Sequence, residues 1–211
     1  MWRGLPWFSS GVKFGIPEIL QDNPDVSTER FPEPIKSKLN SEEGQKLKKA
    51  LSFSQNARKF ALAKELSLIH KNFPMNSIVL APCFITANFG LVALLQITNL
   101  VALPNYILLI LLTIPLYCVY QFAMSIITEK MDLKCDEKLI ELGAAYREGG
   151  VEYYEKRLEK NIALRKLLGK KGEKLFTYYG NEKPGGFFGL RSFGAPITQK
   201  LNRMQKALNN K

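Results

Sequence analysis

The fold of this chain is decided by two apolar runs: SIVLAPCFITANFGLVALLQIT, residues 77–98, and YILLILLTIPLYCVYQFAMSII, residues 106–127. Each run has 22 residues, and a helix of that length extends about 33 Å, enough to cross a hydrocarbon core of about 30 Å. Both runs lie within residues 72–128, which contain no Asp, Glu, Lys, Arg or His. At the average charge content of the chain, a stretch of this length would carry about a dozen charged residues. The sequence therefore predicts two transmembrane helices.

The second run is the stronger of the two predicted spans. It contains twelve residues of Ile, Leu, Val and Phe, and each of them favours insertion at the centre of a helix by about 0.3–0.6 kcal/mol. The first run has eleven such residues but also contains Pro82, Asn88, Gly90 and Gln96. Pro82, and Pro115 in the second run, are tolerated where neighbouring groups satisfy the freed carbonyls.

The segment between the runs, residues 99–105, is short and uncharged, and it contains the turn signal Pro104–Asn105. So short a connection predicts an antiparallel helical hairpin with both tails on one side of the bilayer. The alternative, a hairpin buried in a soluble core, would need a larger shell of amphipathic helices than the rest of the chain offers. We therefore divide the chain into an N-terminal tail with a juxtamembrane helix (1–71), transmembrane helix 1 (77–98), a linker (99–105), transmembrane helix 2 (106–127) and a C-terminal helical tail (128–211).

Both tails are predicted to be helical and amphipathic, so the expected fold class is mostly α. In the N-terminal tail, Ser41 is a suitable N-cap because Glu42 and Glu43 follow it in the first turn. Residues 54–70 are rich in helix formers, and we expect Leu62, Leu66 and Ile69 to share one face.

The C-terminal tail is predicted to continue the second span as a helix. An apolar stripe runs along it, and the pair Gly149–Gly150 is expected to end it. A second amphipathic helix is predicted over residues 151–168, and a last one over residues 196–208. Residues 183–189, KPGGFFG, are interpreted as a glycine-rich loop.

The net charge of +11 is confined to the two tails. Residues 1–71 carry a net charge of +4 and residues 129–211 a net charge of +7. The positive-inside rule therefore places both tails on the cytoplasmic side or its equivalent, the mitochondrial matrix. Basic residues beside anionic head groups explain the excess charge without a nucleic-acid partner, so no nucleic acid is expected.

The residue types needed for catalysis or metal binding are scarce. The chain has one histidine, His70, and three cysteines, Cys83, Cys118 and Cys135, with no CxxC pair. A zinc site needs three or four ligands, and a Ser–His–Asp site needs a positioned histidine. Residues 169–174, GKKGEK, lack the Ser or Thr that follows the lysine of a phosphate loop. We therefore predict no enzyme, no catalytic, cofactor-binding or metal residues, no cofactor and no small-molecule substrate.

Four uncharged residues of the predicted spans have two readings each. Asn88 and Gln96 are eight residues apart and share a face. They either contact the second span or a partner's helix, or they add mild polarity near the linker. Cys83 and Cys118 are expected to be buried small apolar residues, because two intramembrane thiols without His or Met neighbours make a poor copper site.

Three stretches resemble the transmembrane protein 177 family: SQNARKFALAKEL (54–66), GAAYREGGVEYYEKRLEKNIALRKLLGKKGEKLFTYYGN (143–181) and, more faintly, SSGVKFGIPEIL (9–20). The resemblance covers most of the chain, and the spans match in hydropathy and position. It implies a multi-pass protein of the mitochondrial inner membrane that assists the assembly of cytochrome c oxidase (complex IV). It also implies two partners besides the lipid bilayer: newly made oxidase subunit 2 and the scaffold chaperone that holds it while copper is delivered. The resemblance brings no catalytic residues or metal ligands with it.

Members of that family have additional N-terminal sequence with a further hydrophobic stretch, whereas the likeness here begins almost at Met1. We therefore expect a shortened form or an incomplete gene model. Arg3 and Lys13 precede the first acid, Glu18, and make only a weak import presequence. Two alternative functions are a small oligomeric channel or carrier and a membrane-bound enzyme. The first has few polar residues to line a path, and the second has no nucleophile–base set.

The predicted topology can be tested by protease protection of tagged termini. In isolated mitochondria whose outer membrane has been opened, we expect tags at both ends of the chain to resist added protease, because both tails lie in the matrix. Cleavage of only one tag would contradict the hairpin, and cleavage of both would reverse its orientation.

Overall fold

The computed structural model of the chain describes residues 2–3, 13–14, 33–70, 73–98, 103–185 and 194–209. Helices dominate these residues, which confirms the predicted mostly-α class. Two short strands, β1 (Trp2–Arg3) and β2 (Lys13–Phe14), pair antiparallel with Trp2 opposite Phe14. The linker residues 99–102, the loop residues 186–189 and the side chain of His70 lie outside the described residues, as does most of the weak presequence.

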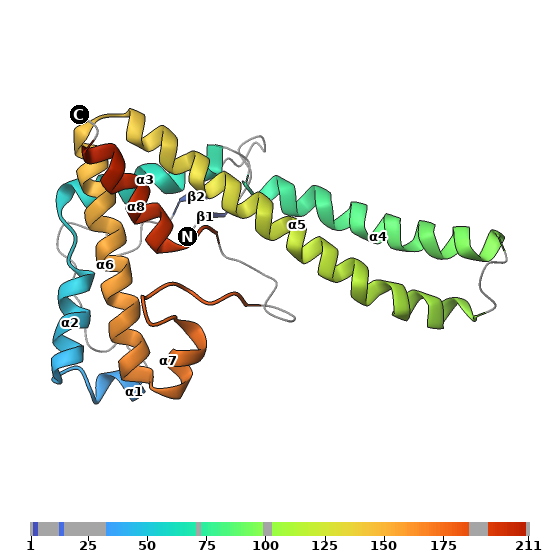
Figure 1. The fold of residues 1–211 in the computed structure, drawn as a ribbon, viewed down its shortest axis with the longest axis horizontal. Helices are drawn as coiled ribbons and strands as arrows, with labels where there is room; N and C mark the ends of the chain where they lie inside the picture. The colour runs from blue at the N-terminus through green and yellow to red at the C-terminus, as the bar shows by residue number, and fades with distance from the viewer. Residues whose placement is uncertain are drawn as a thin grey trace.

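The two apolar runs form a long helical hairpin that extends from one side of a helical domain (Figure 1). Its arms are α4 (Phe73–Ile97) and α5 (Asn105–Glu141), which pack along each other. Pro82 and Pro115 lie inside these helices, as expected of tolerated membrane prolines. The span limits 77–98 and 106–127 remain sequence predictions, because α4 begins before residue 77 and α5 continues to Glu141.

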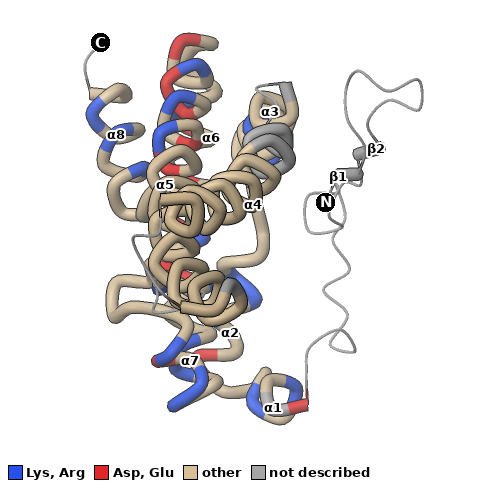
Figure 2. Tube along the Cα trace, turned by 90° about the vertical axis from the view of Figure 1, so that its right-hand side faces the viewer, with Lys and Arg blue, Asp and Glu red and all other residues tan. Residues whose placement is uncertain are grey.

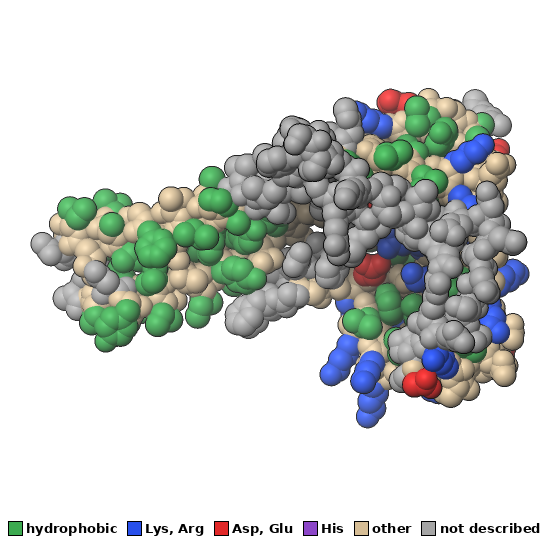
Figure 3. Space-filling view, turned by 180° about the vertical axis from the view of Figure 1, so that it is seen from behind, with side chains coloured by type: hydrophobic (Ala, Val, Ile, Leu, Met, Phe, Trp, Pro, Cys, Tyr) green, Lys and Arg blue, Asp and Glu red, His purple; other side chains and the backbone are tan. Residues whose placement is uncertain are grey.

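The hairpin presents apolar side chains to its surroundings on nearly all sides. Only 11% of the apolar window Leu80–Ile97 is buried within the protein, and the same share holds for Tyr106–Glu141. Figure 2 shows the near part of the hairpin without any charged residue, and Figure 3 shows hydrophobic side chains along its surface. The core hairpin of a soluble protein would be mostly buried, so the two helices are membrane spans in composition, length and exposure.

The helices before and after the hairpin pack together at one end of it (Figure 1). The central helix is α6 (Ala144–Leu168), which packs against α2 (Glu42–Leu51), α3 (Gln55–His70) and α8 (Ile197–Asn209). Two shorter helices, α1 (Glu33–Lys36) and α7 (Lys170–Leu175), also contact α6. We call this assembly the helical domain.

The helical domain has two apolar clusters. One joins α1 and α2 to the C-terminal half of α6 and consists of Ile35, Leu39, Leu47, Leu51, Ala163 and Leu167. The other joins α3, α5, α6 and α8 and consists of Phe60, Leu139, Tyr154, Ile197 and Met204. The second cluster is the one that reaches the hairpin, because Leu139 belongs to α5.

Local signals placed several helix ends correctly. Ser41 is the N-cap of α2, and its hydroxyl accepts a hydrogen bond from the Gly44 amide at 3.2 Å. The helix predicted over residues 54–70 is α3, and Gly169 ends α6 with a φ of +55°. Residues 196–208, predicted to be helical, contain most of α8.

The prediction that Gly149–Gly150 ends a helix was wrong. The helix ends earlier, at Glu141, and Gly143 adopts a φ of +120° in the break. Gly149 and Gly150 lie inside α6, where neighbouring helices approach closely. A Cβ at Gly149 would be 2.3 Å from the Asn56 carbonyl oxygen, and one at Gly150 would be 2.9 Å from the Phe60 ring. These glycines are needed for close packing, which is a tertiary requirement.

The face of α3 predicted from Leu62, Leu66 and Ile69 is only partly buried. Leu66 is 56% exposed, although Ile69 is buried. The face turned toward α6 instead carries Ala57, Phe60, Ala61 and Lys64, at i, i+3, i+4 and i+7, and all four are buried. Hydropathy missed this face because its last member is a lysine.

Gly149 provides a test of the close approach between α3 and α6. Because a methyl group there would meet a backbone carbonyl that cannot rotate away, we expect Gly149→Ala to lower the free energy of unfolding by about 1–3 kcal/mol. Denaturation of the full chain in detergent measures the change. Gly90→Ala is the matched control, since a Cβ at Gly90 has no neighbour within 4 Å. Equal stability of the two variants would contradict the close packing.

Candidate functional site

Polar and charged side chains from four helices meet in the interior of the helical domain, beyond the apolar part of α5. We call this set the buried ion network: Lys64 from α3, Asp132 and Asp136 from α5, Tyr154 from α6 and Lys200 from α8. Each of these residues is 6% exposed or less. The arrangement therefore removes four charged groups from water at the point where the hairpin joins the domain.

Lys64 is at the centre of the buried ion network. Its Nζ lies 2.7 Å from Asp132 Oδ1 and 2.8 Å from Asp136 Oδ1. It also donates a hydrogen bond to the Tyr154 hydroxyl, and that hydroxyl donates to Asp136 Oδ1 at 2.7 Å. One lysine from the segment before the hairpin thus holds two carboxylates of the segment after it.

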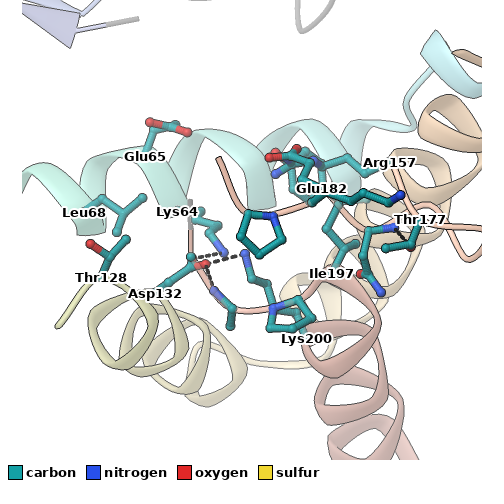
Figure 4. Close-up of a pocket in the computed structure, with 17 residues that line it drawn as sticks. Lys64, Glu65, Leu68, Thr128, Asp132, Arg157, Thr177, Glu182, Ile197 and Lys200 are labelled. Carbon is teal, nitrogen blue, oxygen red and sulfur yellow. Dashed lines mark hydrogen bonds and ion pairs between the residues drawn. The ribbon is translucent and has the colours of Figure 1, made fainter. Parts of the chain in front are cut away.

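Asp132 has three partners. Lys200 pairs with its Oδ2, and the amide of Ala195 donates to the same oxygen at 3.3 Å. Figure 4 shows Lys64 and Lys200 converging on this carboxylate. Gly194 permits the chain to approach here, because its φ is +129° and a Cβ would lie 2.5 Å from Asp132 Oδ2.

The charges of the buried ion network balance, with two lysines facing two aspartates. Burial lowers the pKa of Lys64, but the carboxylates of Asp136 and Asp132 outweigh it and raise that pKa above its ordinary value. Burial, reinforced by the same two carboxylates, raises the pKa of Tyr154 well above its usual range. Tyr154 is therefore a neutral hydrogen-bond donor. For Lys200, burial and the nearby Lys64 lower the pKa despite the contact with Asp132.

A cavity of about 410 Å³ lies beside the buried ion network. Leu68 and Thr128 line it on the side of the hairpin, and Lys64, Asp132 and Lys200 line its floor. At another part of the wall, Arg157 pairs with Glu182 at 2.9 Å. Lys64 and Lys200 both pair with Asp132, and Arg157 pairs with Glu182, so each of these charged groups has a partner within the protein. Such pairing is expected of a structural connection between segments of the domain.

A second polar contact lies inside the hairpin. Asn88 is 6% exposed, and its Nδ2 donates a hydrogen bond to Thr113 Oγ1 of α5 at 2.6 Å. This confirms the reading of Asn88 as a contact with the second span. Gln96 does not join it, because its Nε2 donates to the Leu103 carbonyl near the linker at 3.1 Å.

The cysteines differ from expectation at one position. Cys135 is buried, as expected of a small apolar residue, and Cys118 is partly buried. Cys83 is exposed on the hairpin, so the prediction that it would be buried was wrong. A lipid-facing position accommodates a small thiol as well as a protein core does. Across residues 33–70, 73–98, 103–185 and 194–209, no group of three His, Cys, Asp or Glu residues could hold a metal ion.

The sequence placed Tyr154 on the apolar face of the helix predicted over residues 151–168, and Tyr154 is buried, but it indicated no role for the charged members of the buried ion network. One signal was present: Asp132 and Asp136 are four residues apart and flank Cys135 on the predicted apolar stripe of the C-terminal tail. Two acids on the buried side of a helix require cations from elsewhere. Which lysines supply the charge depends on the packing of α3 and α8, and neither is near in sequence.

Comparison with known proteins identifies relatives along nearly the whole chain. The chain is 31% identical over 219 residues to Transmembrane protein 177 of Mus musculus, an alignment covering 96% of the chain and 67% of the relative. The protein of that name from Xenopus laevis is 30% identical, with 97% and 68% covered. The one from Danio rerio is 32% identical, with 98% and 69% covered. No family model matches the chain, and no solved structure matches it.

The buried ion network can be tested by removing its central cation. We expect Lys64→Ala to lower the free energy of unfolding by about 3–5 kcal/mol, because Asp136 then stays buried without a cation. The double variant Lys64→Met/Asp136→Leu should recover much of this loss, since Asp132 keeps Lys200. Denaturation in detergent reports both changes.

Lys46→Ala is the control for the removal of an ion pair in water. Lys46 pairs with Glu42 on the surface of α2, where 53% and 81% of the two side chains are exposed. We expect this variant to unfold almost as the unaltered chain does. A loss for Lys64→Ala no larger than for Lys46→Ala would contradict the stabilising role of the network.

Proposed function

The chain belongs to the transmembrane protein 177 family, and from this membership we propose that it is a non-catalytic assembly factor of the mitochondrial inner membrane. In this proposal it supports the biogenesis of cytochrome c oxidase (complex IV) by acting on newly made subunit 2, together with the scaffold chaperone of that subunit. Both tails lie in the matrix. The hairpin packs beside the membrane helices of the client or the chaperone, and the helical domain lies on the matrix side of the membrane.

The observation that carries the proposal is the continuity of α5. This helix has 37 residues and extends about 55 Å from the turn of the hairpin to the second apolar cluster of the helical domain. A rigid helix joins the lipid-facing surface to the domain, and the buried ion network fastens it there. Such a connection suits a protein that fixes the orientation of a membrane segment relative to an aqueous domain.

The surface of the hairpin supports lateral packing with another helix. On α4, Gly90 is exposed and open, and Ala87 and Cys83 are exposed one and two turns before it, respectively. Small residues permit close approach between membrane helices, where packing and not water exclusion drives association. We therefore assign the contact with the client to this face of α4, which we call the Gly90 face.

The channel alternative has less support. A pore needs polar groups that are free to line it, whereas Asn88 and Gln96 donate hydrogen bonds to groups of the same hairpin. A conductance assay with purified protein in liposomes distinguishes the two functions.

The proposal is tested by capture of the full chain from mitochondria after pulse labelling of their translation products. We expect newly made oxidase subunit 2 to co-purify in detergent and oxidase levels to fall when the gene is deleted. Recovery of no labelled product, together with normal oxidase after deletion, would refute it.

The Gly90 face is tested with a bulky substitution. Gly90→Leu should reduce capture of subunit 2 at least severalfold while leaving unfolding of the chain unchanged, because nothing surrounds that position. Val119→Leu on α5 is the matched control, since Val119 is 64% exposed and already large. Equal capture by both variants would move the contact elsewhere on the hairpin.

A further inference from the structure

One surface of the helical domain combines basic and aromatic side chains and has no described neighbour. We call it the α7 surface: Lys170, Lys171, Lys174, Leu175, Tyr178 and Tyr179. Helix α7 lies on the side of the domain from which the hairpin extends (Figure 1). In the view from behind, basic side chains project beyond the body of the domain on that same side (Figure 3).

The positive charge of the α7 surface is not neutralised within the described part of the chain. Lys170, Lys171 and Lys174 are exposed, and none of them forms an ion pair or hydrogen bond with another described residue. The one acid of α7, Glu173, lies 3.7 Å from Arg165 of α6. Three unpaired cations within five residues therefore face away from the domain.

The apolar members of the α7 surface are unusually exposed for a folded domain. Leu175 is 53% exposed, Tyr178 76% and Tyr179 70%. The two tyrosine rings stack edge to face, with centroids 5.5 Å apart. Tyrosine combines an apolar ring with a polar hydroxyl, which is why it gathers at membrane–water interfaces.

The turn that carries the tyrosines is held by backbone hydrogen bonds. The Thr177 amide donates to the Asn181 carbonyl at 2.8 Å, and the Lys183 amide donates to the Leu175 carbonyl at 2.8 Å. The Asn181 side chain also contacts α8, because its Nδ2 donates a hydrogen bond to Thr198 Oγ1 at 3.0 Å. The two tyrosines therefore lie on a turn beside α7 that hydrogen bonds hold in place.

We propose that the α7 surface rests on the anionic head groups of the same bilayer that α4 and α5 cross. The hairpin keeps the domain at this bilayer, and the α7 surface lies on the side that faces it. Lysines beside a membrane bind anionic lipid and their alkyl chains reach along apolar surface, while the tyrosines and Leu175 enter the interfacial layer. The contact sets the tilt of the helical domain relative to the membrane, and it does not depend on the proposed assembly role.

The proposal is tested by lysine footprinting of the full chain in lipid nanodiscs that contain no other protein. Amine acetylation is followed by mass spectrometry in phosphatidylcholine discs and in discs that also contain phosphatidylglycerol. We expect Lys170, Lys171 and Lys174 to react about fivefold more slowly in the anionic discs, and high salt to abolish the difference. Lys49 of α2, which is exposed, is the internal control and should react equally in both.

Substitutions separate the aromatic contribution from the charge. Tyr178→Ser/Tyr179→Ser should restore at least half of the lost lysine reactivity in anionic discs. Leu142→Ser is the matched control, because Leu142 is 60% exposed but lies outside the α7 surface, and it should leave the footprint unchanged.

Two results would overturn the proposal. One is equal reactivity of the three lysines, relative to Lys49, in neutral and anionic discs. The other is protection in whole mitochondria without protection in discs of either composition, which would assign the α7 surface to an acidic protein partner.

Discussion

Helix α5 passes from a lipid environment into a folded domain without a break, and its two parts need opposite surroundings. The part up to Ile127 carries no charge, whereas Asp132 and Asp136 lie on the buried side of the part that follows. Two carboxylates in a protein interior are unfavourable unless cations reach them. Lys64 comes from the helix before the hairpin, and Lys200 comes from the last described helix. Because both lysines form ion pairs with the aspartates of α5, segments from both ends of the helical domain pack against α5.

The packing around α6 follows from the same requirement. Lys64 reaches Asp132 and Asp136 because α3 packs against α5, and Gly149 and Gly150 let α3 also lie close to α6. Tyr154 completes the arrangement, because its ring packs against Phe60 while its hydroxyl donates to Asp136. Apolar packing and ion pairing therefore use the same residues here, and losing either would disturb the other. Removing one partner of such a buried pair leaves the other charge without compensation, which is strongly destabilising.

This construction suits a protein whose work lies in positioning. The hairpin offers exposed apolar faces to the bilayer and to other helices, and α5 transmits the orientation of those faces to the helical domain. The proposed contact of the α7 surface with the head groups adds a second attachment of the helical domain to the membrane. A domain held at two places beside a bilayer presents its remaining surfaces in a constant direction, which is useful to an assembly factor and irrelevant to a pore.

The membrane hairpin, the helical class of the tails and several helix ends could be predicted from the amino-acid sequence. These features depend on local properties: a charge-free stretch of 57 residues, the cap at Ser41 and the glycine at residue 169. The packing of the helices was needed to show which face of α3 is buried, why residues 149 and 150 must be glycine, and which lysines reach Asp132 and Asp136. Burial of a charge is favourable only when its partner arrives from a distant part of the chain, and periodicity along one helix contains no information about that partner.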